Sequence, residues 1–429
     1  MTTVIIGGGW SGLAAAVTLT QQGQTVHLIE SAKQLGGRAR NVQWHEQLID
    51  NGQHLMIGAY DRMLSMMHTV GVNPQQAFHR LPMDITIVDT QYSPLKLSAN
   101  SILPWPISLA SNLIRSAGLR GFYSVAKLQS NIPKLLSKQD ISVSEWLLST
   151  KQPVRLIKQL WEPLCLATLN TPISHASAHL MAIVIQDSLG KGPRAADSLI
   201  PRLPLADVFP HAAANYIQQH GGMISLKTRA KQLIVEQGKV TGLLCQDGSQ
   251  LLAENIIVAT SPSQSAALLA EHGSFEQPSE YPICTVYLQY SAQTRLSKPM
   301  LGMTGTISQW IFDRSEQSPG LMAVVISAPG DHQAMTNKEL AEHVCQEVHS
   351  LFPELASTVN DSLVIREKRA TFSCVVGVEK RRPTCQTNVQ GLYLAGDYIA
   401  NSYPATLEGA IRNGENSAQT LLKQSKFSR

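Results

Sequence analysis

Short runs of apolar, β-branched residues alternate with glycine-rich turns at the start of the chain. Residues 3–6 read Thr-Val-Ile-Ile and residues 25–29 read Thr-Val-His-Leu-Ile, which is the composition of buried strands. Between them, residues 13–19 are almost entirely apolar, which predicts a helix that Gly23 can terminate. The pattern therefore predicts a strand–helix–strand unit of a parallel sheet.

The pattern changes character in the middle of the chain. Eleven prolines between residues 76 and 209 predict a series of short helical pieces. Residues 221–262 return to strand-like alternation, with a hairpin expected near residues 240–248. The segment that starts at residue 205 therefore resumes the type of structure with which the chain begins.

The second half of the chain repeats this change. Residues 285–290 and 321–326 alternate as strands, and residues 337–351 read as a helix. Residues 392–397 form a last buried strand, followed by a final helix. We therefore predict an α/β fold of two interleaved lobes. One lobe takes residues 1–75, 205–265 and 385–429, and a mixed α+β lobe takes residues 76–204 and 266–384.

The first turn carries the spacing Gly-x-Gly-x-x-Gly, with Trp10 and Ser11 between the last two glycines. Gly7 permits the tight turn, Gly9 lets the backbone approach a pyrophosphate, and Gly12 lets the helix pack closely on the strand. The free N–H groups at the start of the helix face the phosphates. Glu30 closes the second strand, where it can accept the ribose hydroxyls and would repel a 2′-phosphate.

A second glycine pair follows this unit, in the sequence Gly36-Gly37-Arg38-Ala39-Arg40. Gly37 gives the loop freedom, and Arg38 and Arg40 can bring cationic groups onto a diphosphate. With the first motif, this loop resembles the FAD-containing amine oxidase and phytoene desaturase superfamily. The resemblance implies FAD as the cofactor, bound in a Rossmann-like nucleotide lobe, residues 1–75, 205–265 and 385–429. It also implies that the mixed α+β lobe is the substrate lobe.

The end of the chain carries a second cofactor signal. The last predicted strand ends in Gly396-Asp397, and Thr406 and Leu407 lie at the start of the final helix. A carboxylate at a strand end can bind the ribityl chain or the pyrophosphate region. A helix N-terminus can stabilise negative charge on a reduced flavin. The resemblance adds Ala230, whose backbone would meet the adenine.

Composition excludes several other classes of protein. The chain has 429 residues, of which 43% are hydrophobic, so it can bury a large core. Its net charge of +4, without a long basic block, argues against a nucleic-acid partner. The six cysteines lack metal-type spacing, so we expect no metal site and reduced thiols in a cytoplasmic protein. We also expect no signal peptide, since the chain begins with the first strand.

Three residues are candidates for catalysis. His54 follows a predicted strand and is either a proton donor or a turn histidine satisfied by backbone groups. Tyr398 and Tyr403 lie in the loop before the final helix, where either could flank the flavin ring. The cations Lys368, Arg369, Arg381 and Arg382 are interpreted as solvated side chains rather than flavin contacts.

Further blocks narrow the resemblance to the squalene-associated FAD-dependent desaturase family, whose members are hydroxysqualene dehydroxylases of bacterial squalene and hopanoid synthesis. These blocks are residues 50–54, 58–60, 161–164, 170–172 and 404–410. The resemblance implies that hydroxysqualene, a polyprenyl lipid, loses its allylic hydroxyl and gains a hydride from reduced flavin. The sequence does not identify the electron donor. An oxidative polyprene desaturase and a non-catalytic prenyl-lipid binding protein stay open as alternatives.

Two long uncharged stretches, residues 97–114 and 163–186, are expected to line a tunnel for such a lipid. The first contains Trp105 and two prolines, which make it a poor membrane-spanning helix. It is either a segment that dips into a bilayer interface, with Trp105 as its anchor, or a buried helical lid. Peripheral contact with the inner membrane therefore stays open.

Overall fold

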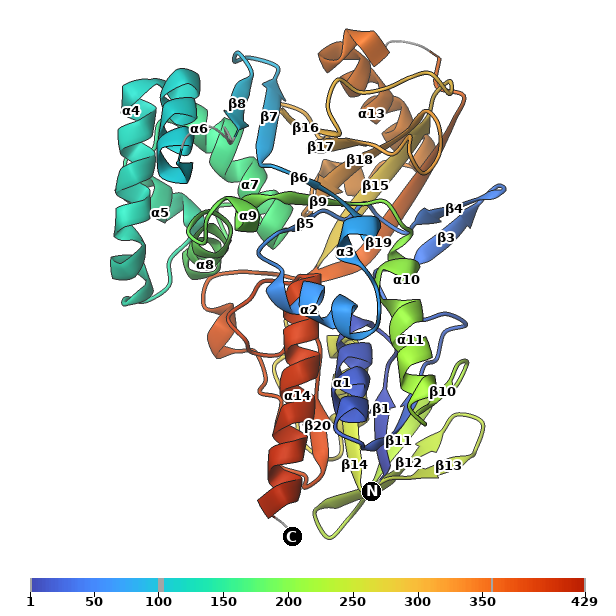
Figure 1. The fold of residues 1–429 in the computed structure, drawn as a ribbon. Helices are drawn as coiled ribbons and strands as arrows, with labels where there is room; N and C mark the ends of the chain where they lie inside the picture. The colour runs from blue at the N-terminus through green and yellow to red at the C-terminus, as the bar shows by residue number, and fades with distance from the viewer. Residues whose placement is uncertain (1, 99–103, 356–357, 428–429) are drawn as a thin grey trace.

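The computed structural model describes residues 2–98, 104–355 and 358–427, which form a lower and an upper lobe (Figure 1). A five-stranded parallel sheet lies at the centre of the lower lobe. In spatial order its strands are β10 (Met223–Ser225), β2 (Thr25–Ile29), β1 (Thr2–Ile6), β14 (Asn255–Val258) and β20 (Leu392–Leu394). Three stretches of chain that are far apart in sequence therefore supply one sheet.

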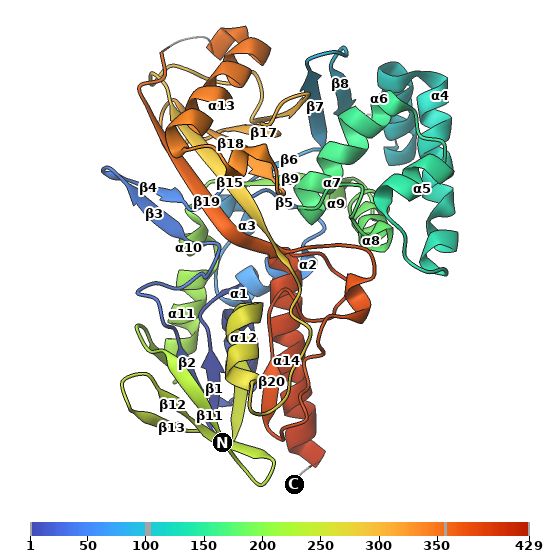
Figure 2. The same cartoon turned by 180° about the vertical axis from the view of Figure 1, so that it is seen from behind.

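Side chains of β1 alternate between two layers that cover this sheet. Ile5 belongs to an apolar cluster with residues of three helices, whereas Val4 and Ile6 belong to a cluster with Leu233 and Leu243 of a small antiparallel sheet. The helices are α1 (Trp10–Gln21), α11 (Pro210–Gln219) and α14 (Leu407–Phe427). The small sheet comprises β11 (Ala230–Glu236), β12 (Lys239–Cys245) and β13 (Gln250–Leu252), with α12 (Pro262–Leu269) beside it (Figure 2).

A seven-stranded mixed sheet forms the frame of the upper lobe. The parallel pairing of β7 with β16 joins chain segments that lie more than two hundred residues apart. Helix α13 (Asn337–Leu351) packs on one face through Leu340, Val344 and Val348. In spatial order the strands are β19 (Asp361–Phe372), β15 (Glu280–Gln289), β18 (Leu321–Ser327), β17 (Trp310–Asp313), β16 (Met300–Thr304), β7 (Asp84–Asp89) and β8 (Leu95–Ser98).

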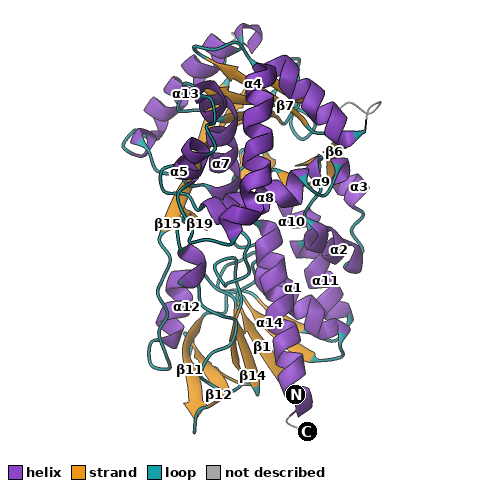
Figure 3. Ribbon diagram, turned by 90° about the vertical axis from the view of Figure 1, so that its left-hand side faces the viewer, coloured by secondary structure: helices purple, strands orange, loops and turns teal. Residues whose placement is uncertain are grey.

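A group of helices flanks this sheet, and the longest, α4 (Trp105–Leu136), runs down the front of the lobe in Figure 3. The prolines do not divide α4 as expected, since Pro106 lies in its first turn, where proline costs no helical hydrogen bond, and the helix continues past Pro133 to Leu136. α4 instead consists of two helical segments that meet at a kink at Gly118, whose φ is 71°. The other helices are α5 (Val143–Ser149), α6 (Val154–Leu156), a π-helical turn (Ile157–Trp161), α7 (Glu162–Leu169) and α8 (Ala178–Leu189).

Short elements connect the two lobes. They are a three-stranded sheet of β5 (Met56–Ile57), β9 (Ser198–Pro201) and β6 (Phe78–Leu81), the hairpin of β3 (Asn41–Trp44) and β4 (Gln47–Asp50), and the helices α2 (Asp61–Thr69), α3 (Pro74–Ala77), α9 (Pro193–Ala196) and α10 (Leu205–Val208). Among the described residues, no helix is both long and apolar enough to cross a bilayer.

Candidate active site

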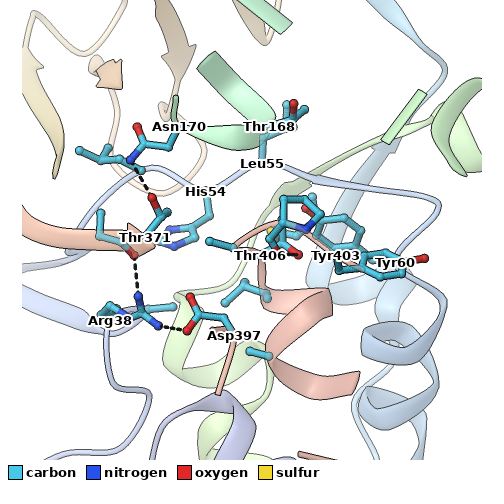
Figure 4. Close-up of a pocket in the computed structure, with 18 of the residues that line it drawn as sticks. Arg38, His54, Leu55, Tyr60, Thr168, Asn170, Thr371, Asp397, Tyr403 and Thr406 are labelled. Carbon is cyan, nitrogen blue, oxygen red and sulfur yellow. Dashed lines mark hydrogen bonds and ion pairs between the residues drawn. The ribbon is translucent and has the colours of Figure 1, made fainter. Parts of the chain in front are cut away.

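A cavity of about 1310 Å³ extends across the junction of the two lobes. Its polar end is lined by the loops that follow β1, β2 and β20, and its apolar end by α4, α7, α8 and the upper sheet. Figure 4 shows side chains from both lobes converging on the region between these ends. The cavity therefore connects the predicted cofactor loops with the predicted substrate lobe.

The three glycines of the first turn meet different surroundings. Gly7 has a φ of 111°, and a Cβ atom there would lie 2.5 Å from the carbonyl oxygen of Ala259. A Cβ on Gly12 would lie 2.0 Å from the carbonyl oxygen of Gly7, so this glycine allows α1 to pack on the turn. A Cβ on Gly9, by contrast, would find only the Cα of Gly37, at 4.0 Å. Gly9 therefore borders an open cradle that a side chain would fill, as a bound pyrophosphate requires.

The start of α1 provides an unpaired polar group at this cradle. The hydroxyl of Ser11 is buried and has no hydrogen-bond partner among the described residues, and Ser11 lines the cavity. Trp10 also borders the cavity, while its ring packs 5.2 Å from Phe209 and its Nε1 donates to the carbonyl of Ala39 at 3.4 Å. A helix N-terminus with an unsatisfied hydroxyl fits a phosphate group.

Glu30 lies at the carboxyl end of β2, on the wall of the cavity. Its Oε2 accepts a hydrogen bond from the backbone N–H of Gly8 at 2.7 Å, and its Oε1 accepts one from that of Ala32 at 2.7 Å. These bonds fix the carboxylate beside the glycine turn. The negative charge at this point disfavours a 2′-phosphate, and its contact with the ribose stays a prediction.

The second glycine loop packs directly against the first. The N–H of Gly36 donates to the carbonyl of Gly8 at 2.9 Å, and Gly37 has a φ of 61°. Arg38 then donates through Nη2 to Asp397 Oδ1 at 2.6 Å. Arg40 turns back and donates to the carbonyl of Gly37 at 2.7 Å. The Arg38–Asp397 ion pair joins the N-terminal and C-terminal cofactor loops around one cavity.

The C-terminal loop is shaped by its own backbone. Gly396 has a φ of 147°, and Asn413 of α14 donates to its carbonyl at 2.7 Å, which holds the loop against the final helix. Thr406 caps α14 by accepting from the N–H of Gly409 at 3.1 Å, and Leu407 is the first residue of the helix. Thr406, Leu407 and Asp397 line the cavity, and Ala230 lines it from the start of β11.

The interpretation of Arg382 from the sequence is wrong. We expected a solvated cation, but its side chain is fully buried. The guanidinium donates to the backbone carbonyls of Asp397 at 2.7 Å and of Tyr403 at 2.7 Å, and its carbon lies 4.7 Å from the ring centre of Phe372. Arg382 therefore holds the loop that presents Asp397 and Tyr403. Neighbouring Arg381 is half-exposed, as expected, and pairs with Glu276.

His54 lies on the cavity wall beside the polar end (Figure 4). Its Nδ1 lies 2.9 Å from the carbonyl oxygen of Gly52, so the neutral ring carries its proton on Nδ1 and presents Nε2 as an acceptor. Burial lowers the pKa of His54, against the opposing effects of the Gly52 carbonyl and Asp50. His54 can therefore donate a proton into the cavity only after it takes one up.

The two loop tyrosines have different environments. The Tyr398 ring stacks on Phe275 at 5.8 Å and its hydroxyl donates to Ser265 at 2.8 Å, so it lies in the core and outside the described lining of the cavity. This placement argues against a catalytic role for Tyr398. Tyr403 lines the cavity and donates its hydroxyl hydrogen to Asp187 of α8. Burial, and then the bond to Asp187, raise the pKa of Tyr403, so the phenol stays protonated.

Tyr60 adds a second phenol to the same wall, near Thr406 and Tyr403 (Figure 4). Burial, its largest influence, raises the pKa of Tyr60, so this phenol also stays neutral. Sequence reasoning noted Tyr60 only within a block of family resemblance. Tyr60 lies between β5 and the start of α2. Its place on the cavity wall depends on the pairing of β5 with β9, which the local sequence does not show.

The part of the cavity inside the upper lobe is mainly apolar, with polar lining residues such as Thr168 and Asn170. Both uncharged stretches contribute to it, residues 97–114 and residues 163–186, although residues 99–103 lie outside the described residues. Trp105 lines the cavity while its Nε1 donates to the carbonyl of Leu189 at 3.1 Å. Other apolar lining residues are Leu109, Leu113, Phe122, Val125, Leu164, Ala167, Ile183, Met300, Trp310 and Phe312.

Comparison with known proteins agrees with this geometry. The chain is similar to a hydroxysqualene dehydroxylase from Zymomonas mobilis, at 26% identity over 99% of both chains. It is also similar to a 15-cis-phytoene desaturase from Capsicum annuum, at 22% identity over 98% of this chain and 77% of that protein.

Solved structures show the same fold at low sequence identity. An oxidoreductase from Methanosarcina mazei superposes with a TM-score of 0.76 at 16% identity, covering 98% of this chain and 100% of that one. Cyclohexylamine oxidase from Brevibacterium oxydans superposes with a TM-score of 0.70 at 18% identity, covering 99% of both chains. These likenesses confirm the predicted α/β fold.

The sequence profile of the family described as flavin containing amine oxidoreductase matches residues 10–422. The match spans the loop at residues 36–40, the C-terminal cofactor loop and the apolar part of the cavity alike. FAD is accordingly the cofactor that the cradle at Gly9, the unpaired Ser11 hydroxyl and the Arg38–Asp397 pair accommodate. The chain belongs to the flavin containing amine oxidoreductase family and is an FAD-dependent oxidoreductase.

Proposed function

We propose that this enzyme reduces hydroxysqualene to squalene. The observation that supports this most directly is the single cavity that joins the FAD loops to a long apolar compartment. A polyprenyl alcohol has one polar group and a long hydrocarbon chain, so its affinity must come from burial. Burial contributes about 25 cal/mol per Å² of apolar area, partly offset by the lost freedom of the chain. The hydroxysqualene dehydroxylase relatives support the same substrate class.

The reaction balances as a substitution of hydroxyl by hydride. The allylic C–O bond breaks with both electrons on oxygen, a proton joins that oxygen, and water leaves. FAD, once reduced, supplies the hydride that the allylic carbon gains. The protein must supply the proton, hold the chain and exclude bulk water.

The residues around the polar end divide these tasks. His54, when protonated, would give its proton to the leaving hydroxyl, since its ring faces the cavity. The aromatic faces of Tyr60 and Tyr403 would stabilise the positive charge that develops on the allylic carbon. Tyr403 is held in place by its bond to Asp187 and by Arg412, whose guanidinium carbon lies 4.3 Å from the ring centre.

The lobe assignment and the location of the enzyme belong to the same proposal. Residues 1–75, 205–265 and 385–429 would form the FAD-binding domain, and residues 76–204 and 266–384 the polyprene-binding domain. The enzyme would work in the cytoplasm, in peripheral contact with the inner membrane that stores its substrate. It would receive its electrons from a donor that the chain itself does not identify.

Product analysis tests this proposal against the oxidative alternative. Purified enzyme with FAD, photoreduced without oxygen, is incubated with hydroxysqualene. In parallel, enzyme with oxidised FAD and an artificial acceptor is incubated with phytoene. We expect squalene from the first reaction and no desaturated product from the second. Desaturation of phytoene without formation of squalene would replace the proposal with a polyprene desaturase.

A further inference from the structure

Exposed apolar side chains are concentrated on one part of the upper lobe. Of the eleven large apolar residues that the structure describes as exposed, six lie between residues 105 and 154, in the segment that contains α4, α5 and the start of α6. Within α4 they include Ile107, Leu119 and Tyr123, which are 56%, 61% and 68% exposed. Such a concentration of exposed apolar side chains on a protein surface indicates a contact site.

Helix α4 is apolar on two opposite sides, which core packing alone does not explain. Leu109 and Leu113 line the cavity, whereas Ile107 and Ile114 lie on the opposite side of the same helical turns and face outward. Beyond the kink at Gly118, Val125 lines the cavity while Leu119 and Tyr123 are exposed. The helix is therefore a single-layer wall between the apolar cavity and the exterior.

All charged side chains of this helical wall are positive. Helix α4 contains Arg115, Arg120, Lys127 and Lys134 and no acidic residue. All four cations are exposed, and within the described part of the chain none of them forms an ion pair. Unpaired cations beside exposed apolar side chains match a surface with anionic headgroups above a hydrocarbon layer, because the cations meet the headgroups while the apolar groups enter the layer below.

We propose that the outer face of α4, comprising Ile107, Ile114, Leu119 and Tyr123 with Arg115, Arg120 and Lys127, docks the enzyme on an anionic phospholipid bilayer. This inference rests on the proposed function, because docking there places the bilayer one helix away from the polyprene compartment. Trp105, the first residue of α4, lines the cavity. A lipid substrate would pass from the bilayer to the cavity without crossing water.

Vesicle binding of the FAD-loaded enzyme tests this inference. The probe is phosphatidylcholine vesicles with or without phosphatidylglycerol, and the bound fraction is measured by flotation. The test variants are Arg115→Glu/Arg120→Glu and Leu119→Asp/Tyr123→Asp. The matched control is Leu252→Asp/Lys338→Glu, since Leu252 and Lys338 are 77% and 86% exposed on other elements. All substituted side chains are exposed, so the fold and the bound FAD should be unaffected.

We expect binding that requires phosphatidylglycerol and weakens with salt, and that falls at least about tenfold in both α4 variants but not in the control. Equal binding by the α4 variants and the control, or no vesicle binding by the parent, would overturn the docking surface. So would a parent dimer that the α4 variants dissociate in the absence of vesicle binding, because the face would then join two copies of this chain.

The same variants separate docking from catalysis. With detergent-solubilised hydroxysqualene, the α4 variants should turn over as the parent does, whereas with vesicle-presented substrate they should be slower. If no preparation converts hydroxysqualene but vesicle binding still depends on α4, the proposed function fails and the docking surface stands.

Discussion

Replacing Arg382 by methionine should be among the most destabilising single changes in the cofactor lobe. The side chain is fully buried, and its guanidinium donates to the backbone carbonyls of Asp397, Tyr398, Ile399 and Tyr403. A methionine would leave these four acceptors without that donor, at about 1 kcal/mol each. The expected loss of unfolding free energy is therefore about 4 kcal/mol.

Arg381 provides the matched control at the next position. Its partner is Glu276 at 3.1 Å, and both side chains are about half-exposed, so Arg381→Met should cost no more than about 1 kcal/mol. Urea unfolding of the two apoproteins, followed by tryptophan fluorescence, measures the difference. If the free energies of unfolding of Arg382→Met and Arg381→Met differ by less than about 1 kcal/mol, the inference that Arg382 organises the loop is wrong.

The variant Arg382→Lys distinguishes a role of Arg382 in positioning the Asp397 loop from a role in stability alone. Lysine keeps the charge but offers three donors from one point instead of a planar fork, so it cannot reach all of the carbonyls. We expect a folded protein whose FAD affinity falls and whose flavin absorbance spectrum changes, because Asp397 is no longer fixed on the cavity wall. Unchanged FAD affinity and spectrum in this variant would reduce Arg382 to a purely structural role.

Three further predictions concern the cavity. Gly9→Val should yield apoprotein, because its side chain fills the cradle beside Gly37, and flavin absorbance after purification checks this. If His54 is the proton donor, kcat/KM should fall as pH rises through a value below 6.5, because burial lowers the pKa of His54. The variant His54→Gln should then lose this pH dependence. A pH profile of the parent enzyme that is itself flat in the acid range argues for another donor. Ala167→Trp should shorten the apolar compartment and raise KM for hydroxysqualene more than for a shorter allylic alcohol such as farnesol, in detergent assays with FAD occupancy unchanged.

The elements that local sequence determines were predictable. Residues 25–29 and 337–351 coincide with β2 and α13, because each carries its own periodicity within clear boundaries. Thr336 and Glu339 even form a capping box at the start of α13. The glycine turn after β1 was equally readable, since Gly7 has a positive φ and Gly12 packs against the backbone of the same turn.

Features that depend on distant contacts were not predictable in the same way. Arg381 and Arg382 are adjacent cations of the same local pattern, and only the packing of the loop at residues 397–403 buries one and exposes the other. Tyr398 and Tyr403 are likewise equivalent in sequence, but Ser265 and Asp187, each more than a hundred residues away, direct one into the core and the other to the cavity. The prolines of α4 were mistaken for breaks, because Pro106 falls in the first turn, where proline is tolerated, whereas the kink lies at Gly118.

A single-turnover experiment tests the central claim most directly. Enzyme with photoreduced FAD is mixed anaerobically with hydroxysqualene in detergent, and flavin absorbance and products are measured in the same sample. We predict that flavin is reoxidised and that one squalene forms for each flavin oxidised, with release of water. Reduced flavin that persists, with hydroxysqualene recovered unchanged, would contradict the assignment of this cavity to the reduction of a polyprenyl alcohol.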